Sequence, residues 1–592
     1  MSIVAQIKEV TAKAIKELYS VDVNVADITV SATKPEFEGD YTIVLFTFIK
    51  QLKKSPDILG NEIAGYLFKN NEHLFSGFNV IKGFLNLTVA DSYWIQFLQS
   101  AYNNALFGIK EKTERKVMVE YSSPNTNKPL HLGHLRNNFL GWSTAEILKA
   151  AGNEVVKTCI VNDRGIHICK SMIAWKLFAN GTTPESTGLK GDHFVGEYYV
   201  KFNDEYKKQT DELVAKGMSK EIAEKEAAIM KAAQQMLVDW EAGKPNVVEL
   251  WKTMNSWVYA GFAETYKTIG SDFDRIYYES DTYLLGKDMV DLGLKKNAFY
   301  QKEDGSVWID LTADGLDEKI VKRKDGTSVY ITQDIGLIIN KYEEYKCEES
   351  IYVVGDEQQY HFKVLKLIAQ KLGLPSAKGI YHLSYGMVEL PSGKMKSREG
   401  TVVDADDIVD EMINIAEQKT KELGKVKDFA EEDLKELYDT IGLGALKFFL
   451  LRIDPKKRII FNPEDSIDFH GFTGPFIQYA HARIKSILRK EKVTVYGLPV
   501  TGALFNLEKK IIIHLEQFPS VIEEAAAEHD PSKIAIYVFE LAKIFNSFYT
   551  EHSIANAESE EKKILRLQLS QLTACTIKTA MGLLGIKVPE RM

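Results

Sequence analysis

The sequence is poor in cysteine and contains no long hydrophobic run. Four cysteines are scattered along the 592 residues without a CxxC pair, at Cys159, Cys169, Cys347 and Cys575. This spacing argues against a disulfide framework and against a zinc site, and it favours a reducing, cytoplasmic location. No apolar run reaches the roughly 20 residues of a membrane-spanning helix, and MSIVAQIKEV lacks the features of a signal peptide. We therefore expect neither secretion nor a membrane partner.

Charge is distributed unevenly along the chain. The formal net charge of -9 argues against a nucleic-acid partner for the chain as a whole. Residues 440–592, however, contain 20 Lys and Arg against 17 Asp and Glu, a local charge of +3 that leaves -12 for the remainder. This asymmetry permits RNA binding by the C-terminal part, although solvated helix faces would account for most of the charges.

Residues 116–137, KVMVEYSSPNTNKPLHLGHLRN, carry the strongest local signal. Alternating apolar positions predict a strand, which the Ser-Ser-Pro-Asn sequence then interrupts. A helix is expected from about Leu130 to a stop at Gly152. The N-terminus of a helix that follows a strand and a tight turn binds phosphate through its free N–H groups and its dipole.

Two histidines lie at the start of this helix. His131 and His134 are three residues apart and therefore share a face, and Gly133 between them leaves the backbone open to a flat nucleotide base. The imidazoles are placed to donate hydrogen bonds to charge that develops on an α-phosphate. A metal-binding pair, or two polar histidines on an ordinary amphipathic helix, would show the same spacing. The strand–turn–helix context favours nucleotide chemistry.

The length and the periodicity predict an α/β multidomain protein. We expect a doubly wound parallel (Rossmann-type) catalytic sheet with an inserted subdomain, a small N-terminal α/β domain and a C-terminal α-helical bundle. Long polar helices predict the insertion from 181 to about 300. The strands of the sheet are expected within 116–121, 154–161, 307–311, 328–336, 350–361 and 379–387.

Several motifs resemble those of one enzyme family. HLGH at 131–134 matches the HIGH signature of class I aminoacyl-tRNA synthetases, and KMKSR at 394–398 is similar to their KMSKS signature. The longer run ExSSPNxxKPxHxGHLR resembles arginyl-tRNA synthetases in particular. The resemblance continues through GFLNLTV near the N-terminus and through FIQYAHAR and LLGIKVPERM near the C-terminus.

The resemblance implies ATP-dependent attachment of L-arginine to tRNA(Arg) through an arginyl-adenylate, with Mg²⁺ arriving on ATP, no resident metal and no zinc. It also implies a monomer. The implied domains are an N-terminal additional domain that contacts the tRNA corner, a class I catalytic domain, linker helices and an anticodon-binding domain. Their expected ranges are 1–112, 113–403, 404–439 and 440–592.

Candidate site residues follow from the resemblance and from the charge of the substrate. A guanidinium is planar and always charged, so carboxylates such as Glu120 and Asp334 at strand ends suit it. Solvated carboxylates, a packed tyrosine and a polar helix cap are the plain alternatives for these positions. The resemblance assigns arginine binding to Glu120, Ser122, Asn125, Tyr330, Asp334 and Gln358, and catalysis to His131, His134, Lys128, Lys394 and Lys396. It assigns ATP binding to Gly133, Gly386, Met387 and Val388, and tRNA binding to Tyr479 and Met592.

The second signature departs from the family pattern. Ser397 stands where KMSKS has its second lysine, and a serine cannot supply the missing positive charge. Lys396 and Lys128 are the two candidates to replace it. Lys128 lies beside the phosphate-binding helix start, so we expect it to contribute more.

Three other interpretations remain. The chain could be a class I synthetase for cysteine or glutamine, against which the paired carboxylates and the absence of zinc cysteines argue. It could be a small-molecule nucleotidylyltransferase, which would hardly need a C-terminal bundle of this size. Finally, it could be a non-catalytic tRNA-binding paralogue, although His131, Gly133, His134 and Lys394 are intact.

Overall fold

The computed structural model describes residues 2–283, 285–325, 329–391, 403–424, 429–491 and 502–592. The N-terminal domain is a four-stranded antiparallel sheet with helices, in the strand order β1-β2-β4-β3. Its first helix covers residues 3–19, and residues 75–89 form a hairpin of two antiparallel strands. The elements are α1 (Ile3–Tyr19), β1 (Val30–Ala32), β2 (Tyr41–Val44), α2 (Phe46–Leu52), α3 (Pro56–Asn70), β3 (Phe75–Ile81), β4 (Phe84–Val89) and the connecting α4 (Asp91–Ala101).

The catalytic region is built on a five-stranded sheet in the order β12-β11-β5-β6-β7, in which every neighbouring pair is parallel. The doubly wound parallel sheet predicted from sequence is therefore confirmed. β5 is central, and α5 follows it directly in the chain. The strands and their helices are β5 (Lys116–Glu120), α5 (Leu132–Ala150), β6 (Glu154–Val161), α6 (Ile166–Phe178), β7 (Arg275–Tyr278), β11 (Glu349–Gly355), α15 (Gln359–Lys371) and β12 (Ile380–Tyr385).

Two expected strands of this sheet are wrong. The segment 307–311 contributes β9 to a separate antiparallel sheet in the order β10-β9-β8. The segment 328–336 enters a helix, α14 (Tyr330–Tyr345), because its isoleucines recur at helical spacing and face a core at Ile331, Ile335 and Ile338. The remaining elements here are α12 (Glu279–Thr282), α13 (Lys287–Lys295), β8 (Tyr300–Gln301), β9 (Val307–Ile309) and β10 (Lys319–Lys322).

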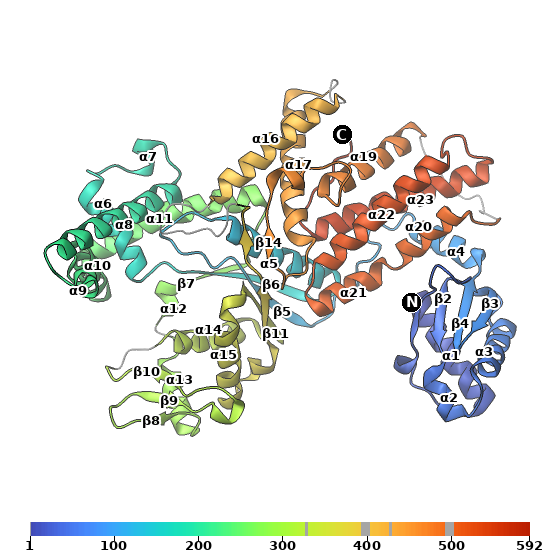
Figure 1. The fold of residues 1–592 in the computed structure, drawn as a ribbon, viewed down its shortest axis with the longest axis horizontal. Helices are drawn as coiled ribbons and strands as arrows, with labels where there is room; N and C mark the ends of the chain where they lie inside the picture. Colours follow the sequence, from blue (N-terminus) through green and yellow to red (C-terminus); the bar gives the residue numbers. More distant parts are fainter. Residues whose placement is uncertain (1, 284, 326–328, 392–402, 425–428, 492–501) are drawn as a thin grey trace.

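A helical insertion separates α6 from β7 and projects to one side of the molecule (Figure 1). The insertion is shorter than the expected range of 181 to about 300. It ends before β7, which pairs with β6 and so belongs to the central sheet. Its helices are α7 (Pro184–Thr187), α8 (Gly191–Ala215), α9 (Lys220–Glu226), α10 (Ala228–Glu241) and α11 (Pro245–Ile269).

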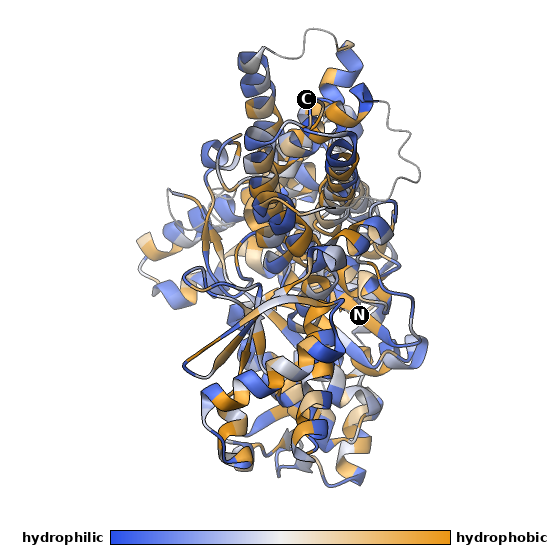
Figure 2. Cartoon of the chain, turned by 90° about the vertical axis from the view of Figure 1, so that its right-hand side faces the viewer, coloured by the Kyte–Doolittle hydropathy of each residue, from blue (hydrophilic) through white to orange (hydrophobic). Residues whose placement is uncertain are grey.

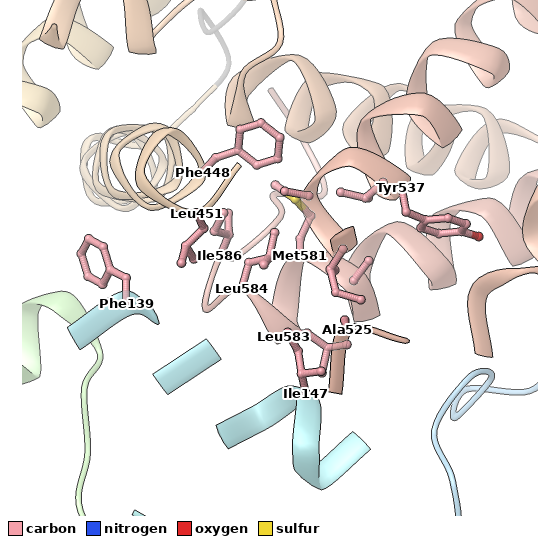
Figure 3. Packing of buried hydrophobic residues seen from close by; sticks show 14 of the residues in the cluster. Phe139, Ile147, Phe448, Leu451, Ala525, Tyr537, Met581, Leu583, Leu584 and Ile586 are labelled. Carbon is pink, nitrogen blue, oxygen red and sulfur yellow. The ribbon is translucent and has the colours of Figure 1, made fainter. Parts of the chain in front are cut away.

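The C-terminal part is helical, as predicted, and its buried residues continue the core of the catalytic region. Figure 3 shows Ile147 of α5 beside Leu583, near the C-terminus of α23, and the Ser143 Oγ donates to the Leu583 carbonyl at 2.8 Å. In Figure 2 the helices carry hydrophobic and hydrophilic residues on different faces. The helices are α16 (Ala405–Leu423), α17 (Glu431–Leu451), α18 (Pro463–Ser466), α19 (Gly474–Lys490), α20 (Asn506–Glu516), α21 (Phe518–Glu528), α22 (Ser532–Glu551) and α23 (Glu560–Leu583).

The N-terminal domain packs against this bundle at the end of the molecule opposite the insertion (Figure 1). The Ile3 N–H donates to Glu516 Oε1 at 2.6 Å, and the Lys509 ammonium lies 2.9 Å from Asp40 Oδ2. Among the described helices, none is long and apolar enough to cross a membrane.

Candidate active site and RNA-binding pocket

The central sheet reverses its order between β5 and β11, the position at which ligands bind in doubly wound sheets. Asn137, in the second turn of α5, forms hydrogen bonds with the chain at the ends of both strands. Its Oδ1 accepts the Ser122 N–H at 2.6 Å, and its Nδ2 donates to the Val353 carbonyl at 2.7 Å. The start of α5 therefore lies across the carboxyl ends of both strands. The sequence analysis missed Asn137, because an amide inside a helix has no recognisable pattern of its own.

The turn after β5 has a strained backbone. Ser122 and Ser123 have φ angles of 79° and 48°, a region that residues other than glycine rarely occupy. Ser122 is buried, and its Oγ lies 2.6 Å from the Tyr266 hydroxyl of α11. Asn125 is exposed and forms a β-bridge with Asn162, which follows β6. Of the two predicted arginine contacts in this turn, Asn125 is the accessible one.

His131 and His134 cap the N-terminus of α5. The Nδ1 atom of His131 accepts the Gly133 N–H at 3.2 Å, and Nδ1 of His134 accepts the His131 N–H at 3.1 Å. Each neutral ring then carries its proton on Nε2, which remains to donate to a ligand. A Cβ on Gly133 would lie 3.1 Å from Cε1 of His131, so a larger residue here would crowd the capping imidazole.

Both imidazoles are uncharged at neutral pH. Burial lowers the pKa of His131 to about 3 and lowers the pKa of His134 well below its usual value, and Lys128 lowers both further. Burial also lowers the pKa of Lys128. Positive charge beside a triphosphate must therefore come from groups other than these histidines, such as the predicted lysines. Of the three predicted lysines, Lys128 is described, whereas Lys394 and Lys396 lie outside the described residues.

Glu120, the last residue of β5, already has an ionic partner. Its Oε2 contacts the Nζ of Lys341 from α14, and the two side chains are 10% and 2% exposed. The Lys341 ammonium also lies 5.1 and 5.3 Å from the ring centroids of Tyr277 and Tyr352. This predicted arginine ligand is therefore a carboxylate in a buried ion pair, not a solvated group at a strand end.

Asp334 and Tyr330 lie on α14, not at the end of a strand as expected. Tyr330 is the first residue of the helix and is 74% exposed, so it is not a packed core residue. Asp334 Oδ2 lies 2.7 Å from Nε2 of His361 in α15. Gln358 is exposed in the short turn between β11 and α15 and occupies the N-cap position of α15, but its side chain makes no capping hydrogen bond.

A further carboxylate, Glu279 of α12, lies close to this group. Burial raises the pKa of Glu279, Arg164 opposes this, and Asp163 and Asp334 raise it further. Asp163 itself is fixed by the Ser280 N–H and hydroxyl, at 2.8 and 2.7 Å. The sequence analysis missed Glu279, since an isolated acid after a short strand carries no motif. The structure thus brings together acids from three separate segments.

The predicted ATP-binding segment Gly386–Val388 is attached to α5 through a second loop. Gly386 N–H donates to the Pro455 carbonyl at 2.9 Å, and Val388, in β13 (Val388–Glu389), pairs with β14 (Ile459–Ile460). Arg136 of α5 is buried and donates from Nη2 to the Pro455 and Lys457 carbonyls, both at 2.8 Å. Arg136 therefore joins the first signature to the segment that precedes the second.

The chain returns to α5 after the second signature. The Leu132 N–H donates to the Val403 carbonyl at 3.3 Å, and the Ala405 N–H donates to the Leu130 carbonyl at 3.0 Å. Beyond this point Lys190 of the insertion lies 2.6 Å from Asp406 Oδ2. Among the described residues, one group has the spacing of metal ligands, but the Lys190 ammonium already contacts two of its carboxylates. That group is Asp192, His193 and Asp406.

A cavity of about 710 Å³ lies in the C-terminal bundle and brings the two predicted tRNA contacts together. Tyr479 and Met592 both line it, with Arg483, Tyr549 and Arg591. The Arg483 guanidinium lies 4.9 Å from the Tyr479 ring centroid and 5.3 Å from that of Tyr549. Aromatic rings with interleaved arginines suit the flat bases and negative backbone of single-stranded RNA.

Comparison with known proteins agrees with this arrangement. Residues 97–462 match the family described as tRNA synthetases class I (R), catalytic domain. Residues 5–89 match the arginyl tRNA synthetase N terminal domain, and residues 477–592 match the DALR anticodon binding domain.

Relatives match along the full length. The chain is 54% identical to the arginine–tRNA ligase of Flavobacterium psychrophilum, with 98% of each chain covered, and 53% identical to that of Parabacteroides distasonis, with 100% of each covered. The solved Thermus thermophilus arginyl-tRNA synthetase superimposes with a TM-score of 0.79 at 25% identity over 100% of both chains. The chain therefore belongs to the arginyl-tRNA synthetase family, whose members are class I enzymes that charge tRNA with arginine.

Proposed function

We propose that the carboxyl edge of the central sheet is the site at which this chain attaches L-arginine to tRNA(Arg). The chain is an ATP-dependent arginine–tRNA ligase of class I. The observation that supports the site is the start of α5, where two neutral imidazoles cap a helix at the reversal point of the sheet. Family membership over the full length supports the substrate.

The reaction has two steps in this proposal. The arginine carboxylate attacks the α-phosphate of ATP, the bond to the bridging oxygen breaks, and pyrophosphate leaves. A terminal ribose hydroxyl of the tRNA then attacks the acyl carbon of the adenylate, and AMP leaves. His131 and His134 donate from Nε2 to the phosphates, while Lys128, Lys394 and Lys396 supply positive charge. Gly133, Gly386, Met387 and Val388 hold the adenosine, and Mg²⁺ arrives with ATP.

The arginine substrate is recognised by carboxylates from a strand and from two helices. Glu120 and Asp334 face the guanidinium, and Glu279 adds negative charge beside Asp334. Asn125, Tyr330 and Gln358 contribute polar contacts from exposed positions, whereas Ser122 acts through the backbone of its turn. Charge-assisted hydrogen bonds of this kind discriminate arginine from neutral analogues.

The outer parts of the chain bind tRNA in this proposal. The domain that ends near 112 contacts the tRNA corner, the insertion α7–α11 contacts the acceptor end, and residues 440–592 read the anticodon in the cavity that contains Tyr479 and Met592. Residues 113–403 form the catalytic domain, and 404–439 link it to the bundle. The enzyme acts as a monomer in the cytoplasm, without a zinc ion.

Charging total tRNA with each radiolabelled amino acid in turn tests the function. We expect arginine alone to be attached, and only in the presence of ATP. Attachment of cysteine or glutamine would identify a different class I synthetase. ATP consumption without tRNA charging would indicate a nucleotidylyltransferase, and the absence of both activities would indicate a non-catalytic tRNA-binding protein.

A further inference from the structure

Lys341 is a buried cation whose charged partner is a predicted substrate ligand. Its side chain is 2% exposed, and its Nζ contacts Oε2 of Glu120. The rings of Tyr277 and Tyr352 lie close to the same ammonium, at 5.1 and 5.3 Å. Two rings and a carboxylate enclose this ammonium. They hold it in place, because moving it away would leave the buried carboxylate without a charged partner.

We propose that Lys341 is a positioning residue for arginine recognition: it binds one oxygen of Glu120 and leaves the other, Oε1, to accept from the substrate guanidinium. The inference rests on the proposed role of Glu120. A carboxylate can accept on both oxygens, so one cation inside the protein and one from the substrate can share it. Lys341 thereby holds the buried Glu120 carboxylate in one orientation, because the ion pair fixes Oε2.

Among the described residues, Lys341 is the cation in contact with the Glu120 carboxylate. Arg275 lies 5.4 Å from the Tyr277 ring centroid, but its guanidinium pairs with Glu344 at 3.7 Å. The other groups close to the pair are the phenol rings of Tyr277 on β7 and Tyr352 on β11, and the Cys159 thiol on β6. Asp334 on α14 interacts with Tyr352. Burial raises the pKa of Cys159 to about 12 and raises that of Tyr352, so neither carries charge at pH 7. The ionic contact that fixes the Glu120 carboxylate is therefore made by Lys341.

Repulsion between the Lys341 ammonium and the substrate guanidinium would have the opposite effect on KM for arginine. A fixed ammonium beside the guanidinium site repels the substrate, so its removal would tighten arginine binding if repulsion dominated. Positioning predicts weaker binding after removal. The sign of the change in KM for arginine therefore distinguishes the two.

Lys341→Met, Lys341→Arg and Lys157→Met test the proposal in the full-length enzyme. Lys157 is a matched control on β6: it is 3% exposed, lies 2.7 Å from Glu146 Oε1, 2.9 Å from Asp272 Oδ1 and 4.7 Å from the Trp142 ring centroid. It contacts none of the predicted site residues that the structure describes. For each variant, KM for arginine, KM for ATP, competitive inhibition by citrulline and Tm are measured. Citrulline has the shape of arginine, but its ureido side chain is uncharged.

Lys341→Met should raise KM for arginine about tenfold or more, the factor that about 1.4 kcal/mol produces. It should change KM for ATP by less than about threefold and lower the preference for arginine over citrulline. Lys341→Arg should preserve most of this preference. Lys157→Met should lower Tm without changing KM for arginine.

A double variant keeps the test valid if Lys341→Met is too unstable to assay. Glu120→Gln with Lys341→Met removes both buried charges, and its KM for arginine should equal that of Glu120→Gln alone, because Lys341 acts only through Glu120. An unchanged or lower KM in Lys341→Met, or additive effects in the double variant, would overturn the proposal. Failure of the unaltered enzyme to charge arginine would instead overturn the proposed function.

Discussion

The proposed site has two halves that are held in different ways. The inner half lies at the end of β5, in the turn after it and at the start of α5, and it contains Glu120, Lys128, His131 and His134. The outer half lies on α14 and in the turn before α15, and it contains Tyr330, Asp334 and Gln358. Glu120 is 10% exposed and paired with Lys341, whereas Asp334 is 39% exposed and paired with His361. Both carboxylates are predicted to bind the guanidinium. Glu120 also belongs to a buried ion pair, whereas the ion pair of Asp334 is partly exposed.

The largest expected effect is in the inner half, at Lys128. If this lysine replaces the missing second lysine of the KMSKS signature, Lys128→Ala should lower kcat about a hundredfold or more, the scale of one electrostatic contact in a transition state. Lys396→Ala should have a smaller effect. Single-turnover adenylate formation on both variants measures the difference, and a larger loss in Lys396→Ala would assign the missing charge to the second signature instead.

The comparison between the two carboxylates is tested by Glu120→Gln and Asp334→Asn. Each should raise KM for arginine roughly ten- to hundredfold, with little change in KM for ATP, because each removes a charge-assisted hydrogen bond. Only Glu120→Gln should also unfold at a clearly lower temperature, since it leaves Lys341 buried without a partner, at a cost of about 3–5 kcal/mol. KM values within about twofold of the unaltered enzyme would disprove the guanidinium assignment, and equal losses of Tm would remove the distinction between the halves.

A variant far from both halves provides a contrast. Tyr479→Ala removes a ring from the C-terminal cavity, and stacking of one base is worth about 1–3 kcal/mol. KM for tRNA should rise about tenfold while adenylate formation persists. Aminoacylation and adenylate formation are measured on the same preparation, and normal charging by this variant would show that Tyr479 serves only in packing.

The smallest expected effect is the pH dependence contributed by the inner half. The pKa values of His131 and His134 are lowered in the folded protein, so the unfolded chain binds more protons. Their contribution to stability is present above the ordinary histidine pKa of about 6.5 and is lost as the pH falls toward the folded values. Because both rings are half-buried, we expect about 1 kcal/mol each between pH 7.5 and 5.5. Urea unfolding at these pH values measures the free energy of unfolding. This free energy should depend less steeply on pH in His134→Gln than in the unaltered enzyme, and an unchanged pH dependence would contradict a neutral His134.

The inner half was predictable from the sequence because its signals are local. Alternation, the Ser-Ser-Pro-Asn break and the Gly152 stop define strand, turn and helix within one short run, and the structure places β5 and α5 there. The cap geometry was not predictable, since nothing in HLGH shows that Nδ1 of each imidazole accepts a backbone N–H.

The outer half was harder because its structure depends on distant packing. The β-branched residues near Ile331 favour a strand locally, but Ile331, Ile335 and Ile338 are buried together on one face of a helix. The sequence did not identify the partners Lys341 and His361 for the same reason. In a sequence, a buried lysine cannot be told from a surface lysine until its partner on β5 is known. Glu120 and Lys341 are 221 residues apart.

One structure tests the central claim most directly: that of the enzyme with a non-hydrolysable arginyl-adenylate analogue. The account predicts the guanidinium between Glu120 Oε1 and Asp334, the phosphate beside His131 and His134, and Lys341 still in contact with Glu120 Oε2. A guanidinium bound elsewhere, or one that displaces Lys341 from Glu120, would contradict it.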